Sequence, residues 1–406
     1  MSMYGLLGQH LAHSWSPQIH EQLGTTPYTL CEVAPDGLAD FLEKTELTGL
    51  NVTIPYKKAV IPYCAELSET ARATGSVNTM LRRENGWYGD NTDFFGFCYL
   101  CKAAGITVAD KKALVFGSGG VSGTVCAALR SLGARQVVVI SRTGENNYQN
   151  LYRHKDAEIL VNATPVGMFP DNGTSPVDLA DFPRCSGVLD LIYNPLRTAL
   201  LIQAEQLHIP NANGLWMLAA QALKSAELFL GHALDEAKIA GIVTTLQKQM
   251  ENIILIGMPG CGKSTVGAIL AQRLHREHLD ADMEIRKTVG TTIPEIFANS
   301  GEDGFRELEA QVLSSLGKKT GVVISTGGGC VTRPENYAAL HQNGRIIWLQ
   351  RDISLLPTDG RPLSQNAELS ELYRVRAPLY ESFVDMCINN DGTAMEAVRK
   401  IKEALQ

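Results

Sequence analysis

The feature that most constrains the fold is a phosphate-binding loop that begins at residue 257 of a 406-residue chain. The run Gly257-Met-Pro-Gly-Cys-Gly-Lys263-Ser264 fits the pattern GxxxxGKS. An apolar, strand-like run at 253–256 precedes it and a helix-like run at 265–274 follows it, which is the context in which this pattern binds a nucleoside triphosphate. The alternative is a glycine-rich turn with a buried lysine stem. A P-loop domain with a three-layer α/β/α parallel sheet is therefore predicted for residues 250–406.

The glycines of such a loop let backbone N–H groups converge on a phosphate at the positive end of the following helix. Lys263 is expected to reach the β- and γ-phosphates, and Ser264 to bind Mg²⁺. The predicted ATP-binding residues are Gly257, Gly260, Cys261, Gly262, Lys263, Ser264 and Thr265. The same positive field favours a thiolate at Cys261. Alkylation of Cys261 that blocks ATP binding is one hypothesis, and an inert small residue in a tight loop is the other.

Length and composition limit the number of domains and the class of protein that this chain can form. A chain of 406 residues is too long for one hydrophobic core and predicts two or three domains. Hydrophobic residues make up 45% and charged residues 19% of the chain, and no apolar run approaches the roughly 20 residues of a membrane span. A net charge of −7 argues against nucleic acid or an anionic membrane as a partner. We expect a globular protein with small-molecule substrates.

The nine cysteines are scattered without metal-ligand spacing, as expected of reduced thiols in the cytoplasm. The start of the chain lacks a basic segment followed by a long apolar stretch, so we expect no secretion signal. Cys98 and Cys101 form a CxxC, but they lie in a helix-like run at 94–104. They are predicted to be core residues and not a redox pair.

The middle of the chain predicts a dinucleotide-binding α/β unit. A strand-like run at 112–116 leads into Gly117-Ser-Gly119-Gly120-Val-Ser-Gly123, and a helix-like run at 124–130 and a second strand at 136–140 follow. The glycines allow a tight turn and close approach of a pyrophosphate to the helix N-terminus. The second strand is followed by Ser141-Arg142-Thr143 and not by an acidic residue, which favours NADP over NAD. The alternative for Arg142 is a solvated surface arginine.

Polar clusters interrupt several β-like pieces in the first hundred residues: Ser14-Trp-Ser16, Asn51 to Lys57, Ser76 to Thr79, and Asp90 to Asp93. Hydroxyl and amide groups of this kind suit a neutral polyol. Lys57 and Asp93 could form an ion pair that passes a proton to the oxygen of a carbonyl group whose carbon receives hydride. Singly, each residue has another interpretation, since Ser16 could cap a helix, Asn78 could form a turn and Lys57 could be solvated.

Taken in order, these segments resemble the shikimate dehydrogenase family over residues 1–249. The matching motifs are His13-Ser-Trp-Ser-Pro17, Asn51 to Lys57, Ser76 to Thr79, Asn91 to Asp93, Asn162 to Met168, Asp190 to Thr198 and Asn213 to Gln221. The resemblance implies a catalytic Lys57–Asp93 pair that reduces 3-dehydroshikimate with NADPH. The implied substrate-binding residues are Ser14, Ser16, Asn51, Thr53, Lys57, Asn78, Thr92, Asp93, Tyr193 and Gln221. The implied NADP-binding residues are Gly117, Gly119, Gly120, Val121, Ser141, Arg142, Thr143, Asn162, Thr164 and Met168.

This resemblance also implies a domain division. Residues 1–104 and 214–249 are expected to form an α/β substrate-binding domain, and residues 105–213 a Rossmann NADP-binding domain. Between Thr143 and Asp156 the chain is shorter than in the family, and no second cation directly follows Arg142.

Two carboxylates near the P-loop fit phosphoryl transfer, which needs Mg²⁺ and a carboxylate at the nucleophilic hydroxyl. Asp280 and Asp282 end a predicted strand, and we assign Asp280 to the metal, through water, and Asp282 to the hydroxyl. A turn-forming pair is the alternative. Arg306 and Glu309 lie three apart on one helix, where the arginine can fork onto a carboxylate. Alone, such a pair is more often a surface ion pair.

The sequences GMPGCGKS, DAD, GFRELE, TGGG, GRPL and RAPLY, in that order, resemble shikimate kinase over residues 251–406. The resemblance implies that Arg306 and Arg376 hold the shikimate carboxylate and that Asp282 contacts the acceptor hydroxyl. It also implies that Gly327, Gly328 and Gly329 line the ring and that Arg361 belongs to the lid over ATP. The run from Leu349 to Arg361 is shorter than the family usually carries.

The two resemblances share one metabolite. We therefore expect an α/β bifunctional enzyme that makes shikimate with NADPH and phosphorylates its 3-hydroxyl with MgATP. Two alternatives stay open: one half is inactive and serves as a ligand sensor or scaffold, or the first half is a quinate-type dehydrogenase that uses NAD. The sequence leaves the oligomeric state open, a homo-oligomer included.

Overall fold

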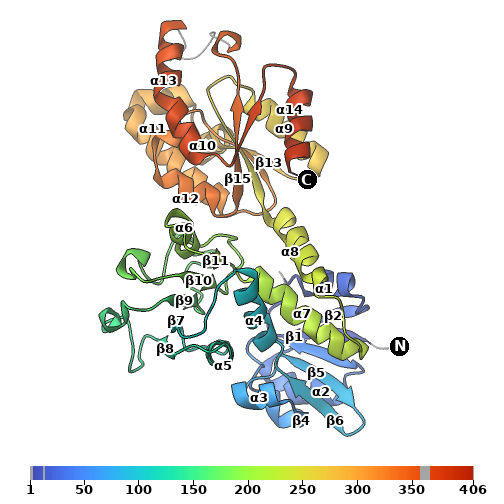
Figure 1. Ribbon diagram of the computed structural model, residues 1–406. Coiled ribbons are helices and arrows are strands. Elements are labelled where there is room, and N and C mark those ends of the chain that lie inside the picture. Colours follow the sequence, from blue (N-terminus) through green and yellow to red (C-terminus); the bar gives the residue numbers. More distant parts are fainter. Residues whose placement is uncertain (1–2, 12–13, 357–365, 406) are drawn as a thin grey trace. The chain divides into compact units, whose positions relative to one another are not determined.

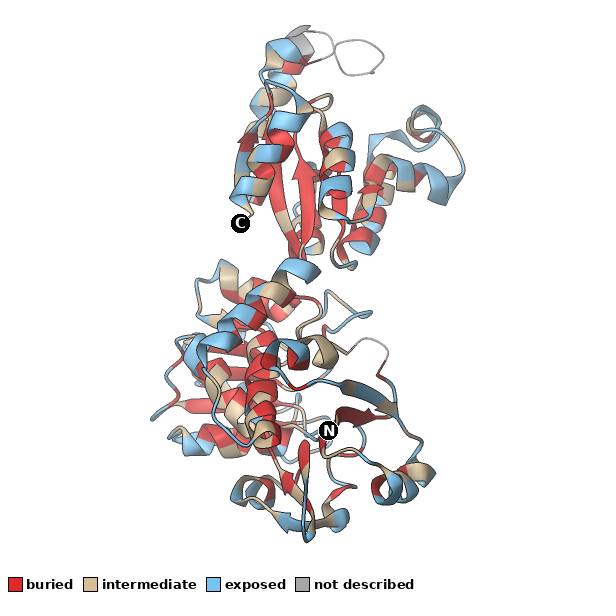
Figure 2. Cartoon of the chain, turned by 90° about the vertical axis from the view of Figure 1, so that its right-hand side faces the viewer, coloured by how far each residue is buried: buried red, intermediate tan, exposed pale blue. Residues whose placement is uncertain are grey.

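The computed structural model describes residues 3–11, 14–356 and 366–405 and has the predicted α/β architecture. The chain divides into two compact units. The first consists of Met1–Met168, Thr174–Tyr193 and Leu200–Leu246, and the second of Phe169–Gly173, Asn194–Ala199 and Gln247–Gln406. We describe each unit by itself. Figure 2 shows that the buried residues of each unit concentrate on its strands and on the inner faces of the helices.

The first unit begins with a mixed six-stranded sheet in the order β2-β1-β3-β5-β6-β4. Its strands are β1 (Tyr4–Gly8), β2 (Tyr28–Glu32), β3 (Gly49–Val52), β4 (Cys64–Leu67), β5 (Thr79–Arg83) and β6 (Gly86–Asp90). The helices beside it are α1 (Ser16–Leu23), α2 (Leu38–Lys44) and α3 (Glu69–Thr74). Because β3 pairs antiparallel with β5, the end of β3 and the start of β5 meet at one edge, where Asn51 lies opposite Thr79.

A parallel five-stranded sheet follows in the order β11-β10-β9-β7-β8. Its strands are β7 (Lys112–Phe116), β8 (Gln136–Ile140), β9 (Ile159–Asn162), β10 (Gly187–Asp190) and β11 (Asn211–Ala212), with helices α5 (Ser122–Ser131) and α6 (Ala199–Gln206). Alternate residues of β7 enter two different apolar clusters: Ala113 and Val115 pack on one face, and Leu114 and Phe116 on the other. Strand β7 lies between β8 and β9, so the order of the strands changes direction at β7. A ligand site is expected at the carboxyl end of a strand in such a position.

Two helices carry the chain between these sheets. Helix α4 (Asp93–Ala103) leads into the parallel sheet and α7 (Leu215–Leu230) leads out of it. The helices pack side by side (Figure 1). Gly96 makes this possible, because a Cβ there would lie 2.8 Å from the Met217 carbonyl oxygen and 3.0 Å from the Gln221 Cβ. Helix α8 (Ala237–Met250) then precedes the second unit.

The second unit is built on a parallel sheet in the order β13-β14-β12-β15-β16. The strands are β12 (Asn252–Ile256), β13 (His278–Asp280), β14 (Val323–Ser325), β15 (Gly344–Gln350) and β16 (Met386–Asn389). The helices are α9 (Lys263–Leu274), α10 (Ala281–Val289), α11 (Ile293–Gly317), α12 (Glu335–His341), α13 (Asn366–Phe383) and α14 (Ala394–Ala404). Figure 1 shows α9 and α14 on one side of the sheet and α11 and α12 on the other, the predicted three layers. The P-loop follows β12, which lies between β14 and β15 at the switch point of the sheet.

Two local expectations were wrong. The Ser14-Trp-Ser16 segment is not β-like, because Ser16 begins α1 with Pro17 in its first turn, a position where a missing N–H does no harm. Ser16 is not the helix cap either, since Trp15 occupies that position. The strand before the two carboxylates ends at Asp280, and Asp282 lies in the first turn of α10.

Candidate active sites

Lys57 and Asp93 form an ion pair in the first unit. Lys57 follows β3 and Asp93 is the first residue of α4, and the Lys57 Nζ lies 2.6 Å from Asp93 Oδ2. The lysine side chain is 21% exposed and the aspartate side chain 9% exposed. The lysine side chain is thus exposed enough to contact a ligand. Both side chains are buried enough for their charges to interact more strongly than in water. The alternative of a solvated Lys57 side chain does not hold.

A buried network of amides and hydroxyls adjoins this pair. Asn78 donates from Nδ2 to Thr92 Oγ1 (3.0 Å) and to Gln221 Oε1 (3.3 Å), and its Oδ1 accepts from the Thr92 backbone N–H (2.7 Å). Asn51 donates to Thr79 Oγ1 at 3.2 Å. Thr92 directly precedes Asp93, so four predicted substrate residues are fixed beside the ion pair.

Tyr28 links Ser16 to this network, and sequence reasoning missed it. Its hydroxyl donates to Asn51 Oδ1 at 2.8 Å, and its ring stacks on His20 with 4.2 Å between the ring centroids. Burial raises the pKa of Tyr28 well above its usual value, and a hydrogen bond with Ser16 opposes that rise. Tyr28 lies on an edge strand without a motif around it, so no sequence signal pointed to it.

The remaining predicted residues of this site are half-buried. Ser14 accepts a hydrogen bond from the Ser16 backbone N–H at 3.2 Å. Thr53 follows β3, and Tyr193 follows β10 in the parallel sheet. Burial raises the pKa of Tyr193, so its phenol stays protonated at neutral pH.

The loop after β7 fits a dinucleotide phosphate. Gly117 has φ +104°, and a Cβ there would lie 2.9 Å from both the Ala163 carbonyl oxygen and the Thr164 side chain. Gly119 and Gly120 are exposed, and Val121 precedes the first turn of α5. Only glycine tolerates this conformation next to a neighbouring loop, and α5 directs its positive end toward the turn.

The residues after β8 are open to solvent. Arg142 and Thr143 are exposed, and Ser141 is half-buried. Arg142 lies close enough to Tyr148 to lower the pKa of that phenol, although burial raises it overall. A free guanidinium at the carboxyl end of this strand fits the 2′-phosphate of NADP.

Asn162 supports the cofactor-side loop from beneath. Its side chain is fully buried, with Nδ2 donating to Asp190 and to the Val166 carbonyl, and with Oδ1 accepting from Thr164. Asn162 therefore shapes the loop through buried contacts, while Thr164 is half-buried and Met168 is 44% exposed.

In the second unit the P-loop has the shape that its glycines predict. Gly257, Gly260 and Gly262 have φ values of +143°, +84° and +99°, all in the region that favours glycine. Lys263 begins α9 and its Nζ donates to the carbonyl oxygens of Gly257 (2.8 Å) and Met258 (3.0 Å). Two backbone carbonyl groups of the loop thus hold the lysine side chain over it. The loop has the conformation predicted for a phosphate-binding site.

The alkylation hypothesis for Cys261 was wrong. Cys261 is fully buried. Its Sγ packs against Gly257 so closely that a Cβ added to that glycine would lie 2.9 Å from the sulfur. A reagent cannot reach this thiol without opening the loop. Cys261 fills the tight loop as a small residue, and Thr265 is exposed at its outer edge.

Ser264 and Asp280 meet at the mouth of the P-loop. The Ser264 hydroxyl donates to Asp280 Oδ2 at 2.5 Å, and Asp280 Oδ1 accepts from the backbone N–H groups of Asp282 and Met283, which caps α10. A hydroxyl and a carboxylate oxygen are the donors that Mg²⁺ takes when phosphates and water supply the rest of its shell. The pair fits the ion, and Asp280 also has the structural role left open by the sequence.

A cluster of charged side chains, Asp282, Arg306 and Glu309, lies beside the P-loop. Asp282 is half-buried, and burial, together with the charge of Asp280, raises its pKa while Lys263 opposes the rise. Arg306 is 8% exposed and its Nη1 lies 2.7 Å from Oε2 of the fully buried Glu309. The pair is therefore not the surface ion pair that its spacing alone suggests. Glu309 was missed as a site residue, although its spacing from Arg306 pointed to it.

The glycines after β14 leave room for these side chains. A Cβ at Gly329 would collide with the Arg306 guanidinium, and one at Gly327 with Glu309 Oε1. Arg376 is 5% exposed and donates to the Gly328 carbonyl at 3.2 Å. Among the residues that the structure describes, the buried Arg306 Nε and Glu309 Oε1 have no hydrogen-bond partner, so this cluster retains polar capacity for a ligand. The predicted lid arginine, Arg361, lies outside the described residues, as do residues 357–360 at the end of the run that was expected to be short.

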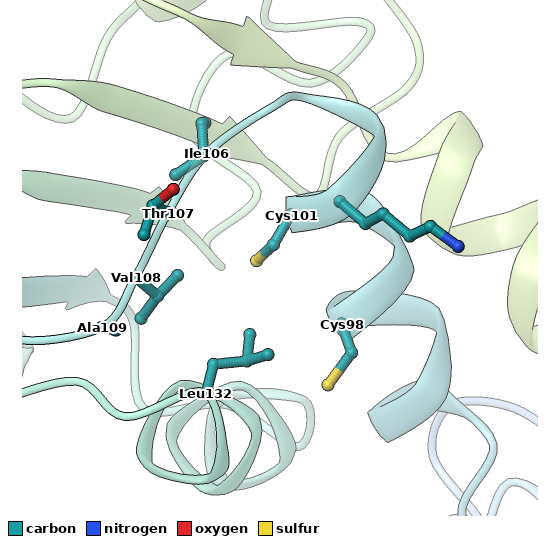
Figure 3. Close-up of a pocket in the computed structure, with 8 residues that line it drawn as sticks. Cys98, Cys101, Ile106, Thr107, Val108, Ala109 and Leu132 are labelled. Atoms are coloured by element: carbon teal, nitrogen blue, oxygen red, sulfur yellow. The ribbon is translucent and has the colours of Figure 1, made fainter.

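A small surface hollow lies beside Cys98 and Cys101 (Figure 3). Ile106, Val108, Ala109 and Leu132 supply the rest of its apolar lining. Burial raises the pKa of Cys98 to about 11 and that of Cys101 to about 12, so both stay thiols at neutral pH. This agrees with the expectation that the pair belongs to the core and not to a redox site.

Comparison with known proteins assigns the two units. Residues 6–80 match the model of the shikimate dehydrogenase substrate binding domain, and residues 259–406 match the model of shikimate kinase. A shikimate dehydrogenase (NADP(+)) from Clostridium beijerinckii is 32% identical over 271 residues, which are 62% of this chain and 100% of the relative. The chain belongs to the shikimate dehydrogenase family. The second match adds a shikimate kinase domain, so the predicted fusion is confirmed.

Solved dehydrogenases share the fold of the first unit. The Thermus thermophilus shikimate 5-dehydrogenase, solved with NADP(H) and shikimate, is 32% identical with a TM-score of 0.55, over 60% of this chain and 99% of that chain. Quinate dehydrogenase from Corynebacterium glutamicum, solved with NAD, is 27% identical with the same TM-score and the same two coverages. No helix in the described part of the chain is long and apolar enough to cross a membrane.

Proposed function

We propose that the first unit reduces 3-dehydroshikimate to shikimate with NADPH and that the second phosphorylates shikimate to shikimate 3-phosphate with MgATP. The observation that carries the proposal is the pairing of two complete sites in one chain. One site holds the Lys57–Asp93 pair beside an amide and hydroxyl network, and the other holds a P-loop beside Asp282 and Arg306. Shikimate is the one compound that both chemistries share.

In the reduction, bound NADPH supplies a hydride to the carbonyl carbon. Lys57 donates a proton from Nζ to the carbonyl oxygen, and Asp93, 2.6 Å away, orients the ammonium group and stays ionised. Asn51, Asn78, Thr92 and Gln221 suit the hydroxyl groups of the ring, because their amides and hydroxyls both donate and accept. Gly117 leaves space for the pyrophosphate, and Arg142 supplies the charge for the 2′-phosphate.

In the phosphorylation, Asp282 accepts the proton of the attacking hydroxyl and directs its oxygen toward the γ-phosphate. Lys263 would move from its carbonyl partners to the phosphates. Ser264, and Asp280 through water, would hold Mg²⁺, which would neutralise charge that develops on the phosphoryl group. Arg306 and Arg376 would fork onto the shikimate carboxylate.

Steady-state assays of the two half-reactions on the purified full-length protein test the proposal. We expect NADPH oxidation that depends on 3-dehydroshikimate, and ATP consumption that depends on shikimate. Activity in one assay alone would favour a chain in which the other half is a sensor or scaffold. Quinate oxidation with NAD in place of the first reaction would favour the catabolic alternative.

We further propose a domain division at residues 104/105, 213/214 and 249/250, which follows the two sheets of the first unit and the start of β12. The nine cysteines, free in the described structure, support an enzyme of the reducing cytoplasm. The acidic net charge supports small molecules, and not nucleic acid, as its partners.

Arg142→Ala is expected to raise the Michaelis constant for NADPH while that for NADH hardly changes. A charge-assisted contact with the 2′-phosphate contributes on the order of 1.5–3 kcal/mol, or about 10- to 100-fold. Arg184→Ala is the matched control, because Arg184 is also exposed but precedes β10, and the amino ends of parallel strands lie at the opposite sheet edge. Equal catalytic efficiency of the unsubstituted enzyme with the two cofactors would contradict the assignment.

Arg306→Ala is expected to act mainly on shikimate affinity in the kinase assay, because the carboxylate that it holds is remote from the transferred phosphoryl group. We expect a rise in the Michaelis constant for shikimate of about tenfold or more, with Arg306→Lys intermediate, since lysine keeps the charge and loses the fork. Arg333→Ala should change neither constant, because the half-buried Arg333 follows the turn after β14 and pairs with Glu307 at the solvent-exposed side of α11. An unaltered affinity in Arg306→Ala would limit the pair to a structural role.

A further inference from the structure

Tyr148 is an exposed aromatic residue beside the loop that fits a dinucleotide. Its side chain is 38% exposed, and its ring stacks on that of Phe116 with 6.4 Å between the ring centroids. Phe116 is the fully buried last residue of β7 and directly precedes Gly117, where the glycine turn begins. The Tyr148 ring therefore lies at the carboxyl end of the parallel sheet, the edge at which a dinucleotide binds.

The loop after β8 brings Tyr148 back to Arg142. The backbones of Ser141 and Asn147 form an isolated parallel β-bridge, and the Asn150 side chain accepts a hydrogen bond from the Asn147 backbone N–H at 2.8 Å. Arg142 and Tyr148 are the next residues along the two paired segments, so they are neighbours across the bridge. The charge of Arg142 accordingly acts on the Tyr148 phenol and opposes the rise in pKa that burial causes.

The two side chains offer hydrogen-bond donors that the protein itself does not use. Within the described ranges, neither the Tyr148 hydroxyl nor the Arg142 guanidinium has a hydrogen-bond or ion-pair partner. Burial raises the pKa of Tyr148, so the phenol is protonated at neutral pH and can donate. A cationic fork beside a neutral O–H donor, both on exposed residues, suits an anion with several acceptor oxygens.

A phosphate would use these donors better than a ribose hydroxyl. The 2′-phosphate of NADP presents several charged acceptor oxygens, enough for the guanidinium and the phenol together, whereas the 2′-hydroxyl of NAD is one neutral oxygen. A hydrogen bond to an ionised acceptor is roughly twice as strong as one between neutral groups. A donor at Tyr148 therefore favours the phosphorylated dinucleotide.

We propose that Tyr148 is a specificity-determining residue of the dehydrogenase, whose hydroxyl donates a hydrogen bond to the 2′-phosphate that Arg142 also binds. The proposal rests on the proposed use of NADPH. It gives the hydroxyl a role that the stacking on Phe116 does not require, because a phenylalanine ring would make the same stacking contact.

Calorimetric titration of the full-length protein with NADP⁺ and with NAD⁺, in the absence of substrate, tests this. Tyr148→Phe keeps the ring and loses the hydroxyl. We expect its dissociation constant for NADP⁺ to rise about tenfold and that for NAD⁺ to change less than about twofold. The ratio of the two constants is the readout, because a general disturbance of the loop would weaken both dinucleotides alike.

Tyr152→Phe is the matched control. Tyr152 is an exposed tyrosine four positions further along, but its hydroxyl already accepts a hydrogen bond from Arg153 Nε at 3.4 Å. Both dissociation constants should therefore stay unchanged in this variant.

An unchanged affinity of Tyr148→Phe for NADP⁺, or an equal loss for both dinucleotides, would overturn the proposal. Binding is measured without turnover, so a protein that binds both dinucleotides as expected but does not reduce 3-dehydroshikimate would contradict the proposed reaction and leave this assignment intact. An unsubstituted protein that binds NADP⁺ no more tightly than NAD⁺ would overturn the cofactor assignment and this proposal together.

Discussion

Lys57→Ala is expected to reduce turnover of 3-dehydroshikimate by about 10²–10⁴, the range for lost acid–base assistance. The carbonyl oxygen, whose carbon receives the hydride, would lose its proton donor, the Lys57 ammonium group, which is 21% exposed in its ion pair with Asp93. Asp93→Asn should fall in the same range, because the amide cannot pair with the ammonium group and orient it. Steady-state reduction by NADPH at saturating substrate measures both.

Lys58→Ala is the matched control for this prediction. Lys58 is the next residue, carries the same charge and is exposed, so its loss should leave turnover near that of the unsubstituted enzyme. Kinase activity should be unchanged in all three variants. Near-normal turnover in Lys57→Ala would show that another group supplies the proton.

Lys263→Ala and Asp282→Asn should each abolish phosphorylation of shikimate and leave reduction intact. In the proposed mechanism, Lys263 organises the phosphates and Asp282 is the carboxylate for the acceptor hydroxyl. The raised pKa of Asp282 adds a prediction about the pH dependence of the unsubstituted kinase. The proton-accepting form of Asp282 is lost as the pH falls through that raised pKa, so kinase activity should decline at a higher pH than an ordinary aspartate would give.

Lys287→Ala serves as the control in the kinase, because Lys287 is an exposed lysine on α10, paired with Glu284, and five residues from Asp282. It should retain phosphorylation. The measurement is a coupled assay of ADP release with added shikimate, beside the reduction assay on the same preparation. Residual phosphorylation in Asp282→Asn comparable with that of Lys287→Ala would remove Asp282 from its assigned role.

Local spacing explains what could be predicted from the sequence. The P-loop and the loop at Gly117 depend on a strand, a few glycines and a helix within about ten residues, and the structure has each of them in place. Lys57 and Asp93 are 36 positions apart, and their pairing was expected from motifs on either side of β5 and β6. In such cases the sequence pattern is sufficient to predict how the residues are arranged.

Packing between distant elements explains what was missed. Ser225 joins Asn51 across 174 positions, and Tyr28 reaches Asn51 from an edge strand, so neither contact follows from periodicity. The depth at which Arg306 and Glu309 lie depends on how closely the glycines after β14 approach α11. Cys261 is another such case. The positive electrostatic field of a P-loop can be predicted from the sequence, whereas the solvent exposure of one thiol in the loop cannot.

The adjacency of α4 and α7 has a consequence for recombination. The cofactor-binding segment leaves the substrate-binding part of the chain after one of these helices and returns through the other, so its two ends start from neighbouring points. A segment with adjacent ends behaves as an insertion. The dehydrogenase could thus exchange its dinucleotide module as a single cassette, cut at residues 104 and 213, without breaking the ion pair at the start of α4 or the contact between Ser225 on α7 and Asn51.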